Sequence, residues 1–445
     1  MEIQSQHPRE HPSIDRRTFL RRAATAGIAL PSMSAILAAC GSGAQDTVDT
    51  GSSASSGVTG ANPYGTGGIP GAPYPLARPE APVTWTVQSD NPVIDSDLEP
   101  EKGATVRVLA WPYYLAPSIW KAFEKKYDCK VEVTEFADMD KGLAKINSGQ
   151  GDFDMLVGMN VWAVGRSIAA GLLRPINLDY VPNLENSWDQ FISPFYDVGS
   201  VFTLPYSIWD TGIMWRNDML DQDIAAMENP YEIFWSGAPK DKTHLLSNAQ
   251  DTLALAMFRD GLSDVNVTDP ATITKAKDDM AQVVEATNAQ FDHVDYTDIP
   301  KGQAWLHQSW SGNVGSAFLF LPEGDQALNV SYYWPGSTDG IPGNVDNDTI
   351  VLLASGQAPV LAHLLANEIL DSENAYTNYT TWTGYQMPQA SFTPEVLVGN
   401  QVVPEHLSTT VVTEEDFAKG SRELELAPDA DALWQAAYAE LVAGV

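Results

Sequence analysis

The sequence predicts an α/β protein in which helices cover the faces of a largely parallel sheet. Segments with strand-like and helix-like patterns alternate along the chain after residue 104, and the hydrophobic content of 44% is sufficient for two or three cores. A second alternating block starts near Thr211, so we expect about two domains.

The first block alternates strands with helices. Apolar and polar residues alternate in the strand candidates, and apolar residues recur at helical spacing between them. Ligands of such sheets bind beyond the carboxyl ends of the strands, so the residues that follow the first and third strands are the first candidates for a site. The expected strands are residues 105–110, 130–135 and 153–157, and the expected helices are residues 118–127, 140–148 and 161–170.

The second block has the same character and follows a predicted turn at residues 204–210, which we interpret as a hinge. No repeat of fixed period and no transmembrane segment is expected in this part. The expected helices are residues 249–259, 270–286, 359–370 and 428–443, and the expected strands are residues 315–321 and 348–354.

The first forty residues predict export. Arg16 and Arg17 precede an apolar run at residues 23–39, which is too short and too interrupted for a comfortable membrane span. Paired arginines before such a run are typical of a twin-arginine signal. The run ends in the segment LAACG, which resembles the lipobox of bacterial lipoproteins, so we expect Cys40 to be acylated.

The next segment is expected to connect the lipid to the body. Residues 41–81 are dense in Gly, Ser, Thr, Ala and Pro, and this composition buries too little apolar area to offset its ordering entropy. We therefore predict a signal peptide at residues 1–39 and a flexible tether with a wrapping segment at residues 40–103. Whether residues 82–103 add an edge strand or wrap around the body stays open. Cys129 has no expected disulfide partner and is predicted to be a free thiol in a core strand.

Composition and motifs exclude several functional classes. Lys and Arg number 25 against 58 Asp and Glu, and no basic cluster follows residue 22, so nucleic-acid binding is not expected. The five histidines beyond the signal lie far apart, which gives no local zinc motif, and neither a nucleophile elbow nor a phosphate loop is present. We therefore predict no catalytic residues, no metal and no other cofactor.

Aromatic residues and carboxylates occur together in loop-like surroundings. Trp111 and Tyr114 follow the first strand, and Trp310 and Tyr385 lie beside glycines. Aromatic faces attract cations, and carboxylates form charge-assisted hydrogen bonds with ammonium groups. The combination favours an organic cation as ligand, whereas core packing is the better explanation of each ring taken alone.

From about residue 105 onward the chain resembles the substrate-binding proteins of bacterial ABC importers, most closely their spermidine/putrescine-binding branch. The resemblance rests on the segments VLAWPYY, GDFDMLV, LPYSIWDT and QSWSG, in this order, and on a later TGYQMP. It implies two α/β lobes that close on a ligand in the cleft between them. One lobe would comprise residues 104–210 plus 347–393, and the other residues 211–346 plus 394–445.

The resemblance also implies a set of ligand contacts. Aromatic residues match the walls of the family's site, and Asp348 matches an acid that contacts an amine. Asn248 and Asp251 match two acids that grip a terminal amine, and the amide at Asn248 lowers the charge offered there. Asn160 lies in the segment after the third strand, where this chain departs from the family. The predicted ligand-binding residues are Trp111, Tyr114, Asn160, Asn248, Asp251, Trp310, Asp348 and Tyr385.

The predicted function is therefore that of a monomeric, lipid-anchored receptor on the outer face of the cytoplasmic membrane. It would capture a polyamine and deliver it to the permease subunits of an ABC importer. One alternative keeps the fold and changes the ligand to another small solute, such as a zwitterion with a quaternary ammonium group. A second alternative is an exported enzyme, because the twin-arginine route often carries cofactor-loaded proteins.

Overall fold

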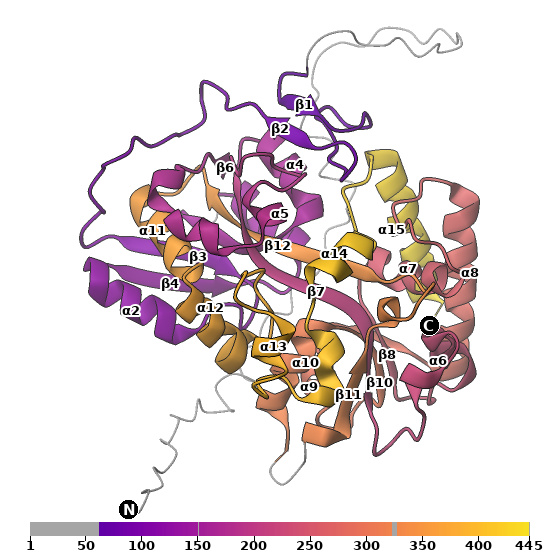
Figure 1. Ribbon diagram of the computed structural model, residues 1–445. Coiled ribbons are helices and arrows are strands. Elements are labelled where there is room, and N and C mark those ends of the chain that lie inside the picture. Colours follow the sequence, from indigo (N-terminus) through magenta and orange to yellow (C-terminus); the bar gives the residue numbers. More distant parts are fainter. Residues whose placement is uncertain (1–61, 150, 323–326, 445) are drawn as a thin grey trace, which may run out of the picture. The chain divides into compact units, whose positions relative to one another are not determined.

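One mixed β-sheet extends across both α/β halves of the described structure and joins them (Figure 1). The computed structural model describes residues 62–149, 151–322 and 327–444, which all belong to one unit at residues 60–445. Cys40 and the predicted signal peptide lie outside the described residues. The strand order is β4 (Lys130–Glu135), β3 (Thr105–Ala110), β5 (Met155–Asn160), β12 (Asn344–Leu353), β7 (Thr203–Arg216), β10 (Leu306–Trp310), β8 (Thr243–Leu246) and β9 (Gln290–Asp292), with β11 (Val330–Tyr333) paired to β7 and β6 (Leu173–Arg174) to β12.

Two long antiparallel strands, β7 and β12, lie at the centre of the sheet, and all their residues are buried. The first half of β7 pairs with β12, and its second half pairs with β10 and β11. The predicted turn at residues 204–210 is therefore wrong, because this segment is the continuous first half of β7. The pairing shifts register opposite Pro205, which has no N–H for the ladder, so a bulge accommodates the proline inside a buried strand.

The first half of the fold confirms the predicted alternation. Strands β3, β4 and β5 are parallel, and α2 (Pro117–Tyr127), α3 (Met139–Asn147) and α4 (Val161–Ala169) follow them in turn. Helix α2 begins with Pro117, whose fixed φ suits the first helical turn, and it buries Ile119 and Phe123 against the sheet. The loops that follow these strands lie at their carboxyl ends, where a ligand is expected.

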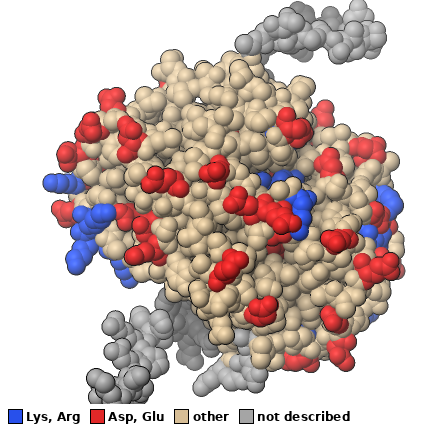
Figure 2. All heavy atoms as spheres, in the orientation of Figure 1, with Lys and Arg blue, Asp and Glu red and all other residues tan. Residues whose placement is uncertain are grey.

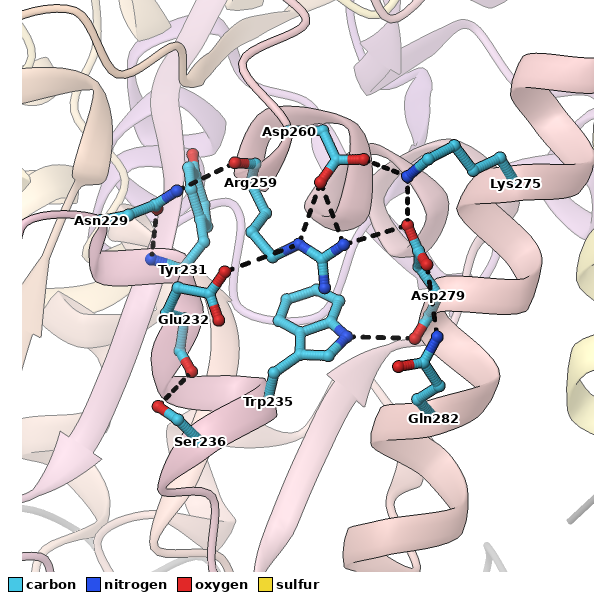
Figure 3. A network of polar contacts seen from close by, with 10 residues as sticks. All are labelled: Asn229, Tyr231, Glu232, Trp235, Ser236, Arg259, Asp260, Lys275, Asp279 and Gln282. Atoms are coloured by element: carbon cyan, nitrogen blue, oxygen red, sulfur yellow. Dashed lines mark hydrogen bonds and ion pairs between the residues drawn. The ribbon is translucent and has the colours of Figure 1, made fainter.

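The second half packs α7 (Ala249–Arg259), α8 (Pro270–Thr287) and α15 (Pro428–Ala443) around a separate apolar cluster. Figure 3 shows a polar network that ties α7 and α8 to α6 (Ile233–Ser236). The Arg259 guanidinium lies 4.1 Å from the ring centroid of Trp235 and contacts the carboxylates of Asp260 and Asp279, each at 3.0 Å. Lys275 contacts both of these carboxylates as well. The guanidinium of Arg259 therefore connects α7 to α8 through Asp279 and to α6 through Trp235.

The remaining α-helices lie mainly in the connections. Residues 315–321, predicted to be a strand, instead fall in helix α10 and the 3-10 turn after it. The large apolar residues of this run lie in the 3-10 turn, and a short apolar run does not distinguish a strand from a helix. These helices are α5 (Asp189–Ile192), α9 (Asp295–Asp298), α10 (Ser311–Ala317), α11 (Pro359–Ile369), α12 (Ser372–Asn378), α13 (Pro394–Leu397) and α14 (Glu414–Lys419).

Part of the predicted tether is ordered. Strand β1 (Gly65–Gly67) pairs with β2 (Val83–Trp85), and Leu76 between them is 2% exposed. The prediction of a flexible tether is therefore wrong for residues 62–81. The two strands form their own small sheet, and the chain after β2 wraps along the body, where the Arg174 guanidinium donates to the carbonyl of Pro92. A glycine- and proline-rich segment can be ordered where a neighbouring surface supplies the apolar area that it lacks.

The described surface is acidic, as expected from a net charge of −33. In Figure 2, Asp and Glu are dispersed over the visible face, whereas Lys and Arg gather at a few places, among them the edge where α2 lies. Cys129, just before β4, is a free thiol that is partly exposed rather than buried in a core strand. In the described part of the chain, no helix has the length and apolar character needed to cross a membrane.

Candidate functional site

A cavity of about 160 Å³ lies where β3, β5 and β10 end and beside the paired strands β7 and β12. Six of the eight predicted ligand-binding residues line it. Its walls therefore come from both halves of the sheet, as the predicted cleft requires. These six residues are Trp111, Tyr114, Asn160, Trp310, Asp348 and Tyr385.

The first aromatic wall depends on a glycine. The indole N–H of Trp111 donates to the carbonyl of Gly158 at 2.7 Å, which brings the loop after β3 against the end of β5. Gly158 has φ +97°, and a Cβ at this position would lie 2.5 Å from Cδ1 of Trp111 and 2.6 Å from Cε1 of Tyr114. Only glycine permits both this backbone conformation and this close approach.

Asp348 lies on β12 at the floor of the cavity and is 1% exposed. The hydrogen-bond partners of its carboxyl group come from the first half of the fold, where β12 pairs Asp348 with Asn160 of β5. The Asn160 amide donates to Oδ1 at 2.7 Å, and the Tyr114 hydroxyl donates to Oδ2 at 2.8 Å. Burial, reinforced by the charge of Asp346, raises the pKa of Asp348 to about 8. With no positive charge beside it, this carboxyl is largely protonated at neutral pH, and an incoming cation would favour its ionised form.

Asn248 and Asp251 lie behind Trp310 rather than in the cavity wall. The indole N–H of Trp310 donates to Oδ2 of Asp251 at 3.2 Å, and the Asn248 amide donates to the same oxygen at 2.6 Å. Asn248 also caps α7 through the backbone N–H of Asp251. The structure places these two residues against Trp310, outside the cavity lining, and their direct grip on a terminal amine stays a prediction.

Several lining residues had not been predicted. His293 stacks on Trp310 with a centroid separation of 5.1 Å and an interplanar angle of 14°. Burial, together with the charge of His307, lowers the pKa of His293 to about 4, so the imidazole is neutral at physiological pH. Its Nδ1 is buried and lacks a hydrogen-bond partner among the described residues. A single histidine in a loop gives no sequence signal of this role. The other unpredicted lining residues are Pro112, Tyr113, Ala137, Trp209, Val294, Tyr296, Asn313, Ser316 and Thr383.

The chemistry of the cavity suits a small organic cation. Seven aromatic rings face it, one buried carboxyl lies at its floor, and the described residues that line it include neither Lys nor Arg. Indole and phenol faces attract a cation with about 0.5–2 kcal/mol each when desolvated. The rings are those of Trp111, Tyr113, Tyr114, Trp209, Tyr296, Trp310 and Tyr385.

Comparison with known proteins identifies related binding proteins. A putrescine/cadaverine-binding protein of Pseudomonas aeruginosa is 23% identical over 291 residues, which cover 64% of this chain and 79% of the relative. Spermidine/putrescine-binding periplasmic protein 1 of Haemophilus influenzae is 21% identical over 273 residues, which cover 61% of this chain and 72% of the relative.

Solved structures share the fold. A putative spermidine/putrescine ABC transporter from Listeria monocytogenes superposes with a TM-score of 0.63 at 19% identity, covering 76% of this chain and 98% of that one. The two-lobed α/β fold predicted from the sequence is thereby confirmed.

A family model also matches more than half of the chain. The model describes bacterial extracellular solute-binding proteins, and it matches residues 118–398. This range includes both central strands and the loops that line most of the cavity. The chain belongs to the bacterial extracellular solute-binding protein family.

Proposed function

We propose that this protein is the substrate-binding component of an ABC importer and that it captures a polyamine such as putrescine or spermidine. The observation that carries the proposal is the buried carboxyl of Asp348 at the floor of a cavity walled by aromatic rings. Both curated relatives described above are named for polyamine binding, which supports the same class of ligand.

The predicted lobe boundaries and ligand contacts belong to this proposal. Residues 104–210 with 347–393 and residues 211–346 with 394–445 would move as lobes about β7 and β12. Closure would exclude water, which strengthens each contact between a carboxylate and an ammonium group. Capture then requires no covalent chemistry, and a transport role without catalysis follows.

The location also belongs to the proposal. Arg16 and Arg17 would direct export by the twin-arginine route, and acylated Cys40 would anchor the protein to the outer face of the cytoplasmic membrane. The ordered segment from residue 62 would leave a short tether between the lipid and the body. A monomer would then present its loaded lobes to the permease.

A second ligand class has support of its own. The cavity offers one lining carboxyl and seven rings, whereas a diamine gains most from two carboxylates. A cage of aromatic rings is the usual surrounding of a quaternary ammonium group, whose charge is spread over its methyl groups. A zwitterion of this kind is therefore the second candidate.

Isothermal titration calorimetry separates the two candidates. The purified protein is titrated with putrescine, spermidine, spermine and betaine, and with a neutral sugar as control. Tight binding of an amine supports the first candidate, and binding of betaine alone supports the second. Binding of the sugar without any of the cations would contradict both.

A further inference from the structure

Two histidines that are distant in sequence lie side by side behind the cavity wall. His244 of β8 and His307 of β10 are direct neighbours in the parallel ladder, and their ring centroids are 5.4 Å apart. Asp292, the last residue of β9, contacts both rings. Its Oδ2 is 2.8 Å from Nδ1 of His244, and its Oδ1 is 3.1 Å from Nε2 of His307. The three potential ligand atoms all lie within 4.8 Å of one another.

The tautomer of His307 is fixed from the other side of its ring. Nδ1 faces the backbone carbonyl of Gln308 at hydrogen-bond distance, so this nitrogen carries a proton. Nε2 then faces Oδ1 of Asp292, and this contact needs either a second proton on the imidazole or a metal ion held by both atoms. A histidine that donates one N–H to a backbone carbonyl and directs its other nitrogen toward a carboxylate is typical of metal ligands in proteins.

A second carboxylate lies beside this cluster of three residues. Oδ2 of Asp298, at the end of α9, lies 3.9 Å from Nδ1 of His244. Two carboxylates carry two negative charges, which a divalent cation would neutralise in a largely buried setting. The side chains of Asp292 and Asp298 are 22% and 16% exposed, so an ion can enter from solvent, whereas the two histidines are buried.

We propose that His244, Asp292, Asp298 and His307 form a structural Zn²⁺ site. Two imidazole nitrogens and two carboxylate oxygens suit the tetrahedral coordination that Zn²⁺ prefers, whereas Ca²⁺ and Mg²⁺ prefer sets made of oxygens alone. Four protein ligands would leave no open coordination position on Zn²⁺, so the ion would stabilise the fold and would not catalyse a reaction. It ties β8, β9 and β10 to α9, and Asp292 directly precedes His293 of the cavity wall. This site is separate from the proposed polyamine site.

Zinc binding to the metal-depleted full-length protein tests the proposal. We expect the wild type to bind one Zn²⁺ in competition with a chromogenic chelator, and its melting temperature to rise when Zn²⁺ is added. His307→Gln should raise the Kd about 100-fold, and Asp298→Asn should raise it at least about 10-fold. Co²⁺ in the wild-type site should give the strong visible absorption of a tetrahedral complex, which both variants should lose.

Controls separate this site from other metal-binding groups. His406→Gln removes a histidine from the same half of the chain and should leave the Zn²⁺ affinity unchanged. If the fully buried His307 cannot be replaced without unfolding, the partly exposed Asp298 still provides the test. Unchanged Zn²⁺ affinity in Asp298→Asn, or a wild type whose melting temperature does not respond to Zn²⁺, would overturn the proposal and leave a protonated His307 paired with Asp292.

Discussion

Replacing Asp348 with asparagine removes the ionisable group at the cavity floor and keeps the shape of the side chain. The wild-type carboxyl accepts hydrogen bonds from the Asn160 amide and the Tyr114 hydroxyl. An asparagine keeps an acceptor for Asn160, and its own amide can donate to the Tyr114 oxygen. The substitution therefore changes the charge of the site more than its packing.

The size of the expected change in the free energy of unfolding follows from the pKa of this carboxyl. Its value is raised from 3.8 to about 8 in the folded protein, mainly by burial. Between these two pH values the folded chain binds a proton that the unfolded chain has released. The free energy of unfolding therefore falls as pH rises, by about 1.4 kcal/mol per pH unit. The accumulated loss at pH 9 is on the order of 5 kcal/mol, and Asp348→Asn avoids it.

Urea unfolding without ligand, repeated from pH 4 to pH 9, measures this effect. The two proteins should differ least near pH 4, and the variant should gain stability over the wild type steadily up to about pH 8. Asp189→Asn, which removes an exposed carboxylate from the same half of the fold, is the matched control and should follow the wild type.

The same group should control ligand affinity. An ammonium ligand requires the ionised carboxylate, so we expect the wild-type affinity for putrescine to rise from pH 6 to pH 8. Asp348→Asn should bind putrescine about 10–100-fold more weakly, the loss of one charged hydrogen bond, and with little pH dependence. A stability difference between variant and wild type that does not change with pH would refute the reasoning about burial.

Four further substitutions test separate parts of the structure. Gly158→Ala should weaken ligand binding at least about 10-fold in calorimetry, because the new Cβ would lie 2.5 Å from Trp111; an unchanged affinity would argue against this wall. Trp310→Ala should reduce affinity by about 10-fold or more through loss of an aromatic face, with a circular dichroism spectrum like that of the wild type. Trp434→Ala, at a fully buried position of α15, should lower the free energy of unfolding by about 3–5 kcal/mol in urea and leave affinity unchanged at low temperature. Arg166→Ala should lower the free energy of unfolding by roughly 2 kcal/mol in the same assay, because Glu425 keeps its hydrogen bond from the Tyr74 hydroxyl but loses its ion pair with Arg166. A stability equal to that of the wild type would show that Glu425 is protonated.

Local sequence patterns predicted most elements of the first half. The alternation at Thr105–Ala110 and at Lys130–Glu135 and the helical spacing at Pro117–Tyr127 each correspond to an element with nearly the same bounds. These segments have one face toward the core and one toward solvent or helices, so their periodicity is visible in the sequence. The prediction failed for β7, because a strand that is buried on both faces and contains a proline shows no alternation.

The candidate site, too, was predicted in part and missed in part. The resemblance to a known family predicted six residues that the structure brings into one cavity. All of them except Asp348, which lies in the middle of β12, are found at a strand end or in a recognisable segment. The resemblance did not predict His293, nor the position of Asp251 behind Trp310, because both depend on which side of a loop or helix faces the cavity.

The sequence by itself determined the α/β class and the strand ends that carry the candidate site with its aromatic and acidic residues. Hydrophobic periodicity and composition are local properties, and they can be read along one chain. Only the tertiary structure decided which distant side chains meet. His244 and His307 lie 63 positions apart and become neighbours because β8 and β10 pair in parallel, a contact that no local pattern encodes.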